Sequence, residues 1–207
     1  MDTSRTTHYS IRSWLALIAL CVLMAISAIA PAVTQGQANQ SPMITSVDNA
    51  TFTVGQPGSF TVTTTGYPAP TLTHSGTLPS GVTFTPNANG TATISGTPTA
   101  TGTFTVTITA SNGVTPNATQ TFTLKVQQAP VITSANSATF AVGQPGSFTV
   151  TALGAPTPAV SLSGNLPSGV TFTPNANGTA TISGTATVTG TYTLTITAAN
   201  GITPNAT

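Results

Sequence analysis

The feature that most constrains this chain is an internal repeat whose period equals the length of a small domain. Pro42 and the four residues after it recur from Pro130 onward with one change, 88 positions later in a chain of 207 residues. Residues 54–62 recur unchanged at 142–150, and residues 78–97 recur unchanged at 166–185. A fixed period of this size predicts tandem modules rather than one large enzyme fold.

The composition indicates the kind of module. Hydrophobic residues make up 39% of the chain but charged residues only 2%, against about 25% in an average soluble protein. Disordered chains usually combine low hydrophobicity with high net charge, whereas the net charge here is +1. Abundant Thr and Val, separated by Gly and Pro, favour strands joined by turns. The sequence therefore predicts β-sandwiches whose solvated faces carry Thr, Ser and Asn in place of charges.

The strand pattern is clearest where Phe104, Val106, Ile108 and Ala110 alternate with threonines. Period-two alternation predicts a strand with one buried and one solvated face. Short strands at intervals of about 8–12 residues predict a two-sheet sandwich. In the first repeat we expect strands at 50–54, 59–64, 71–75, 82–85, 91–95, 103–110 and 120–126. No segment after residue 38 has a helical period, so we expect almost no helix there.

The N-terminal segment, residues 1–38, has the layout of a secretory signal peptide, which we expect to be helical. Two arginines precede an apolar stretch at 14–26, and small residues follow it. An uncleaved signal anchor is the alternative, because residues 14–33 are close to the roughly 20 that span a bilayer. Cys21, the single cysteine, lies inside this stretch. Either alternative predicts a secreted or cell-surface protein that contacts the membrane only through an uncleaved leader.

The repeat also predicts the domain boundaries. The first module is expected at residues 39–129 and the second at residues 130–207. The segment at 127–130 joins them and contains Pro130. A linker this short that contains proline is expected to be semi-rigid.

The second module stops short of its last strand. The counterpart of residues 120–126 would fall after Thr207, and three core side chains would be missing with it. Their burial, at about 1.5–3 kcal/mol each, rivals the roughly 5–15 kcal/mol that stabilises a whole domain. We expect a fragment of a longer repeat protein, with residues 191–198 left as an open edge. The alternative is that another chain donates the strand.

Three motifs occur in the order in which they occur in a known family. They are Leu78-Pro79-Ser80-Gly81-Val82, Ile94-Ser95-Gly96-Thr97-Pro98 and Ala110-Ser111-Asn112-Gly113. In these motifs the chain resembles the immunoglobulin-like domains of the He-PIG type in bacterial surface proteins, which are similar to dystroglycan-type cadherin-like modules. The resemblance covers residues 42–129 fully and 130–207 without the last strand. It implies tandem immunoglobulin-like sandwiches that serve as spacers or adhesive modules on a bacterial surface.

Some cadherin-like relatives bind calcium between modules, so the resemblance makes calcium a candidate cofactor. Calcium takes about six to eight oxygen ligands, usually including several carboxylates. Beyond the leader the chain offers only Asp48, beside Asn49, and Asn136 stands at the counterpart of Asp48. We therefore expect no cofactor.

Few residues beyond the leader can act as an acid or a base. They are Asp48, Tyr67, His74, Lys125 and Tyr192. A nucleophile needs a base that a third group orients, and His74 is a lone imidazole whose counterpart is Leu162. One acid cannot form the carboxylate pair of a glycosidase, and one lysine is no basic patch for nucleic acid. We expect no enzyme and no nucleic-acid partner, and we expect Lys125 to protect an edge strand.

Tyr67 is the single candidate ligand-binding residue. It is expected in a loop at 66–70, and its counterpart in the second repeat is Ala155. The favoured function is a non-catalytic spacer in an exported protein with further repeats. The first alternative is an adhesin module that binds a surface protein or a glycan through such loops. The second is a pair of accessory domains in a larger exported enzyme.

Overall fold

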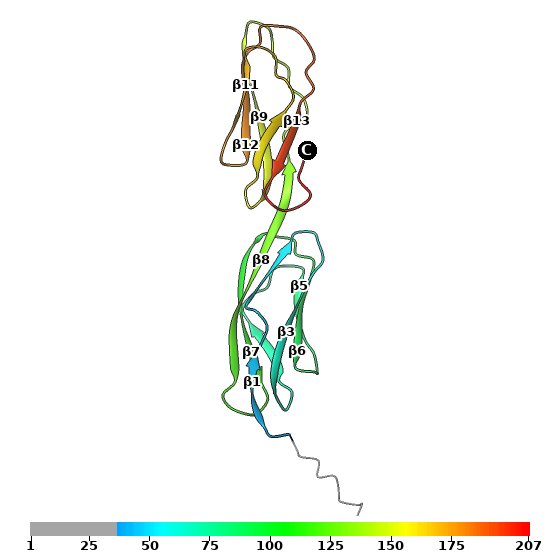
Figure 1. The fold of residues 1–207 in the computed structure, drawn as a ribbon, viewed down its shortest axis with the longest axis vertical. Helices are drawn as coiled ribbons and strands as arrows, with labels where there is room; N and C mark the ends of the chain where they lie inside the picture. The colour runs from blue at the N-terminus through cyan, green and yellow to red at the C-terminus, as the bar shows by residue number, and fades with distance from the viewer. Residues whose placement is uncertain (1–36) are drawn as a thin grey trace, which may run out of the picture. The chain divides into compact units, whose positions relative to one another are not determined.

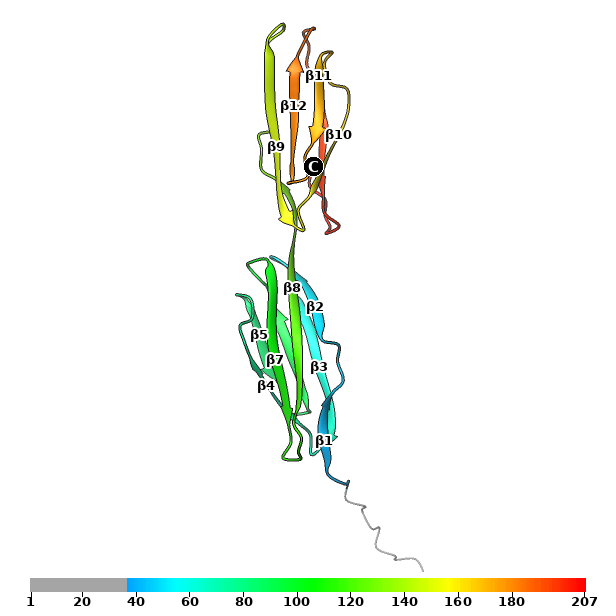
Figure 2. The same ribbon diagram turned by 90° about the vertical axis from the view of Figure 1, so that its left-hand side faces the viewer.

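The computed structural model describes residues 37–207, and every regular element in that range is a β-strand. Figures 1 and 2 show two β-sandwiches, the first drawn in blue to green and the second in yellow-green to red. The tandem all-β fold predicted from the sequence is confirmed, while the predicted signal helix lies outside the described residues. No helix between residues 37 and 207 is long and apolar enough to cross a membrane.

Two sheets form the first module. One has the strand order β1-β3-β6-β5. The other has the order β4-β7-β8-β2, in which β2 runs parallel to β8 and the remaining neighbours are antiparallel. The strands are β1 (Gln40–Ile44), β2 (Asn49–Thr53), β3 (Gly58–Tyr67), β4 (Thr71–Ser75), β5 (Val82–Pro86), β6 (Thr91–Gly96), β7 (Gly102–Ser111) and β8 (Ala118–Ile132).

The core of the first module lies between these sheets. Val62 and Ile94 come from one sheet, and Ile108, Phe122 and Leu124 come from the other; all five are fully buried. The threonines between the buried positions of β7 and β8 are exposed or only partly buried. Because each buried side chain contributes about 1.5–3 kcal/mol, this alternation both closes the sandwich and gives it a threonine-covered surface.

The repeated Leu-Pro-Ser-Gly and Ile-Ser-Gly-Thr motifs form a close backbone crossing. The N–H of Thr97 donates to the carbonyl oxygen of Gly81 at 3.0 Å. A Cβ atom on Gly96 would overlap that carbonyl oxygen, and a Cβ atom on Gly81 would overlap the carbonyl oxygen of Thr97. Both glycines also have positive φ, at 86° for Gly81 and 144° for Gly96. Only glycine fits both requirements, and Gly169 and Gly184 repeat the arrangement.

Strand β8 belongs to both modules. It pairs with β7 from Ala118 to Val126, and its last residues pair with β9 (Pro145–Ala155). The register with β9 shifts between Gln128 and Val131. The linker predicted at 127–130 is therefore part of one continuous strand.

The second module repeats most of this plan. Its first sheet has the order β8-β9-β12-β11, and β10 and β13 form a separate antiparallel pair. Val150, Val160, Ala180 and Ala198 are among its buried residues. The strands after β9 are β10 (Ala159–Ser163), β11 (Val170–Pro174), β12 (Thr179–Thr185) and β13 (Thr195–Ala199).

Two segments of the second module differ from their counterparts. Residues 137–141 correspond to β2, and residues 190–194 correspond to the first half of β7, but neither segment is a strand. The strand predicted over 191–198 is therefore wrong in its first half. In the first module both counterparts pair with β8, and the described part of the second module has no matching strand. Because the two segments lack those backbone hydrogen bonds, they do not form strands.

Candidate functional site

Tyr67, the predicted ligand residue, ends strand β3 and lies opposite Gln40 of β1. The prediction of a loop at this position is wrong, because β1 extends the pairing up to Tyr67. The side chain is 38% exposed. The next residue, Pro68, accepts a hydrogen bond through its carbonyl oxygen from Asn112 Nδ2 at 2.8 Å. The first module therefore presents an exposed aromatic ring on a backbone segment that is tied to the strand ends around it.

The same asparagine joins three segments of the module. Asn112 Nδ2 also donates to the carbonyl oxygen of Gln40 at 2.8 Å, and Asn112 Oδ1 accepts from the N–H of Val114 at 3.1 Å. Asn200 makes the matching bonds in the second module, with donor distances of 2.8 and 2.7 Å. Asn112 belongs to one of the family motifs, but the sequence alone does not predict this role. An Asn-Gly pair after a strand in both repeats was the available signal, because that dipeptide marks turns.

The ionisable side chains of the described chain do not gather into a site. Between residues 37 and 207, no group of three or more His, Cys, Asp or Glu could hold a metal ion. Asp48 Oδ1 accepts a hydrogen bond from Asn49 Nδ2 at 2.9 Å. Lys125 lies on β8 between Thr51 of β2 and Thr103 of β7. The prediction that Lys125 protects an edge strand is therefore wrong, because β8 is an inner strand of its sheet at that point.

His74 is an exposed residue of β4 that packs on an aromatic ring. Its ring centroid lies 4.8 Å from that of Phe84 on β5, with the planes tilted by 50°. Since β4 and β5 belong to different sheets, this contact joins the sheets at their edge. Leu162 stands at the counterpart of His74 and packs against the second core. The position is thus occupied by a packing residue in both modules.

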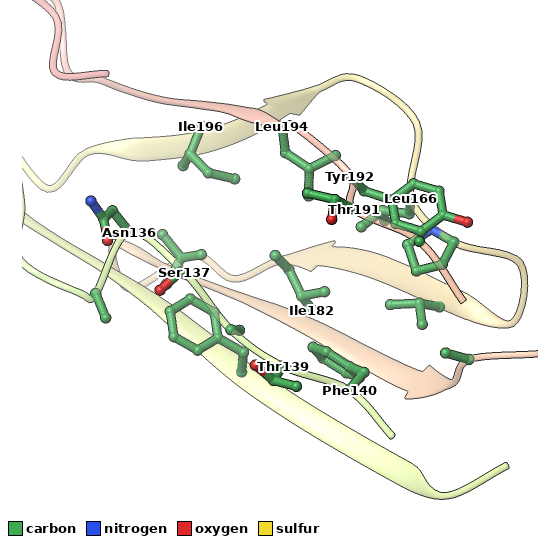
Figure 3. A pocket seen from close by; sticks show the side chains of 18 of the residues that line it. Asn136, Ser137, Thr139, Phe140, Leu166, Ile182, Thr191, Tyr192, Leu194 and Ile196 are labelled. Atoms are coloured by element: carbon green, nitrogen blue, oxygen red, sulfur yellow. The ribbon is translucent and has the colours of Figure 1, made fainter. Parts of the chain in front are cut away.

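An open cavity of about 1040 Å³ lies in the second module. We call it the second-module groove; most of its lining residues lie within 134–142 and 188–196. Figure 3 shows the side chains of Leu194 and Ile196 on one side of the cavity and those of Phe140 and Ile182 on the other. The lining is apolar at its centre, and Asn136 and Ser137 lie toward one end.

The matching surface of the first module is covered. There, strand β8 lies between β2 and β7, and three side chains of these two strands are at most 5% exposed. Their counterparts in the second-module groove are only partly buried. The buried residues are Phe52, Val106 and Ile108, and their counterparts are Phe140, Leu194 and Ile196. The sequence predicts the open edge but not the groove, because the groove also requires residues 137–141 to be unpaired.

Solved structures of immunoglobulin domains are similar to this chain. An I-band fragment of titin matches with a TM-score of 0.56 and 17% identity, over 80% of this chain and 62% of the fragment. The chain thus spans less than two-thirds of that fragment. The IG1 and IG2 pair of DIP-gamma matches with a TM-score of 0.51 and 14% identity, over 80% of this chain and 93% of that pair. These similarities show the immunoglobulin-like fold.

Sequence comparison gives the family. No curated protein matches the chain. The profile of a family described as Putative Ig domain (He_PIG) matches residues 41–127 and, separately, residues 129–207. Each match covers one of the two sandwiches, and together they account for well over half of the sequence. The chain therefore belongs to the He_PIG family of immunoglobulin-like domains.

Proposed function

We propose that the two modules form a non-catalytic spacer in an exported or cell-surface bacterial protein. The observation that carries this proposal is strand β8, which hydrogen-bonds to β7 in the first module and to β9 in the second. A joint made inside a strand is ordered by backbone hydrogen bonds on both sides. That property suits a module whose task is to hold another domain at a distance.

Three further features support the proposal. The two modules repeat one pattern, so the solvated face is mostly the same set of Thr, Ser and Asn side chains. The charged side chains of the described range are Asp48 and Lys125 alone. Export is supported by the arginines and the apolar stretch that open the sequence.

Backbone ¹⁵N relaxation at the junction tests the spacer. The amides of Ala129 and Val131 should have order parameters close to the roughly 0.85 of rigid backbone. Amides in the middle of β7, which is hydrogen-bonded on both sides, supply the rigid reference. Values below about 0.6 at Ala129 and Val131 would show a flexible joint and would overturn the proposal.

An adhesin module is the second candidate, and Tyr67 is the observation that favours it. Tyrosine supplies a large contact area at low conformational entropy cost, and Asn112 fixes the backbone beside this ring. A glycan and matrix-protein binding array should then show a ligand for the unmodified chain and at least roughly tenfold weaker binding after Tyr67→Ala. Tyr192→Ala is the matched control, because Tyr192 is also 38% exposed but lies in the other module. Equal loss in both variants would exclude a Tyr67 site.

A further inference from the structure

We propose that Asn89 and Asn177 are sites of spontaneous deamidation, in which the side-chain amide reacts with the backbone of the next residue and becomes a carboxylate. The chain has four Asn-Gly pairs, and the other two begin at Asn112 and Asn200. Glycine favours this reaction because it has no side chain to hinder approach to its backbone nitrogen. The structure separates the four pairs into two reactive and two protected sites. This inference goes beyond the spacer function and does not depend on it.

The reaction proceeds through a cyclic imide and needs only water. The backbone nitrogen of Gly90 loses its proton and bonds to Cγ of Asn89, the Cγ–Nδ2 bond breaks, and ammonia leaves with that proton. Water then adds its hydroxyl to either carbonyl carbon of the imide and its hydrogen to the glycine nitrogen. The products are aspartate and isoaspartate, in which the main chain runs through the side-chain carbonyl carbon. One neutral amide is thus exchanged for one carboxylate.

The amide oxygen of Asn89 accepts hydrogen bonds from two donors. Thr91 Oγ1 donates to Asn89 Oδ1 at 2.7 Å, and the N–H of Thr91 donates to the same oxygen at 3.2 Å. Negative charge develops on Oδ1 when the nitrogen of Gly90 adds to Cγ, and donors that are already in place stabilise such an oxyanion. The bond to the N–H of Thr91 closes an Asx turn, a ring of atoms that includes the nitrogen of Gly90. Thr179 Oγ1 likewise donates to Asn177 Oδ1 at 2.7 Å.

Both reactive asparagines are exposed residues of hairpin turns. Asn89 lies between β5 and β6, and Asn177 lies between β11 and β12. Every hydrogen bond that the described structure gives these two side chains is accepted by Oδ1, so none has to break when Nδ2 leaves as ammonia. Residues 130–207 contain no charged side chain. Conversion of Asn177 would therefore give the second module its first carboxylate side chain.

Asn112 and Asn200 are held in a different way. Asn112 Oδ1 also accepts from the N–H two residues later, at 3.1 Å, but that residue is Val114 and supplies no hydroxyl. Its Nδ2 donates to the carbonyl oxygens of Gln40 and Pro68, both at 2.8 Å. These two bonds must break before the amide can turn toward the glycine nitrogen, and each should slow the reaction by about two- to tenfold. Asn200 makes the matching bonds.

Incubation of the folded full chain at mildly alkaline pH, followed by peptide mass spectrometry, tests this separation. Asn89 and Asn177 are read as one signal, because residues 78–97 and 166–185 are identical. This signal should grow at least about tenfold faster than the signals of Asn112 and Asn200. The same measurement in urea gives the rate of each site without its folded environment, and each folded rate is divided by that reference. Equal ratios at all four sites, or a larger ratio at Asn112 and Asn200, would overturn the proposal.

The Thr91→Val variant tests the hydroxyl donor. The substitution removes the 2.7 Å bond to Asn89, and it changes the mass of the peptide that contains Asn89, so that Asn177 becomes a separate internal reference. Deamidation of Asn89 should slow by about two- to tenfold relative to Asn177. Thr93→Val is the matched control, since Asn87 Nδ2 donates to both Thr91 and Thr93, at 2.9 and 3.4 Å, but only the Thr91 hydroxyl donates to Asn89. An unchanged or faster rate with Thr91→Val, or equal slowing in both variants, would overturn the proposal.

Discussion

The rings of Phe60 and Phe122 lie with their centroids 4.9 Å apart and their planes tilted by 37°. Phe60 comes from β3 and Phe122 from β8, so this pair joins the two sheets of the first module. The second module has Phe148 at the counterpart of Phe60, where it lines the second-module groove. In the described part of the second module this ring has no counterpart of Phe122 to pack against.

Truncation of this pair should destabilise the first module strongly. Phe122→Ala removes a fully buried ring and should lower the free energy of unfolding by about 3–5 kcal/mol. Urea unfolding followed by hydrogen exchange, peptide by peptide, assigns the loss to a module. Phe148→Ala is the control and should cost less, since its ring already borders the groove. An equal loss for both substitutions would contradict the importance of the ring pair.

Asn112→Ala should destabilise the first module without changing its fold. The substitution removes two donated hydrogen bonds and one accepted bond, each worth about 0.5–1.5 kcal/mol net. A loss of roughly 1.5–4.5 kcal/mol in the same unfolding experiment is expected. Asn117→Ala, at an exposed position, is the control and should stay within about 0.5 kcal/mol of the unmodified chain. Similar losses for the two variants would show that the hydrogen bonds of Asn112 contribute no more to stability than an exposed asparagine does.

Alanine at Gly81 should be far more damaging than alanine at Gly55. Both glycines have positive φ, 86° and 74°, so both substitutions cost roughly 1–2 kcal/mol of backbone strain. A Cβ atom at position 55 has open space, whereas one at position 81 overlaps the carbonyl oxygen of Thr97. Thermal unfolding of the two variants should therefore show a clearly lower midpoint for Gly81→Ala. Equal midpoints would mean that the positive φ angle alone, and not the close contact with Thr97, explains why glycine stands at this position in both repeats.

Calcium should not stabilise this protein. Asp48 is the single side-chain carboxylate in residues 37–207, while calcium takes about six to eight oxygen ligands, usually several of them carboxylates. The thermal midpoint should be the same with added calcium and with a chelator. A calcium-dependent rise that Asp48→Asn abolishes would reveal a site that carbonyl oxygens complete.

The parts of the fold that the sequence predicts well are those that depend on a single strand. Alternation along residues 103–110 predicts which side chains of β7 are buried, and Val106, Ile108 and Ala110 are buried. Strand β1 was not predicted, since Pro42 argues against a strand interior. Pro42 is tolerated in this strand because β1 lies at the edge of its sheet and its register shifts between Gln40 and Met43.

Pairing between distant strands was the harder part. The position of Lys125 depends on β2 joining the far side of β8, which no local pattern encodes. The groove depends on two segments that have strand-like sequences but lack the neighbour that would pair with them. Tyr67 was assigned to a loop because the glycine and prolines around it are turn residues, whereas pairing with β1 extends the strand past that signal. In each case the partner strand decided the structure.

The parallel pairing of β2 and β8 has a mechanical consequence. When the first module is stretched from its ends, tension enters through β1 and passes to β2 once the pairing of β1 with β3 yields, and it leaves at the end of β8. The parallel strands β2 and β8 are then pulled in opposite directions along their length. The backbone pairs from Asn49 to Thr53 are then loaded in shear and share the force. In a hairpin that is pulled open, by contrast, the pairs break one at a time. Residues 137–141 have no such strand pairing. Under tension, the second module should yield before the first.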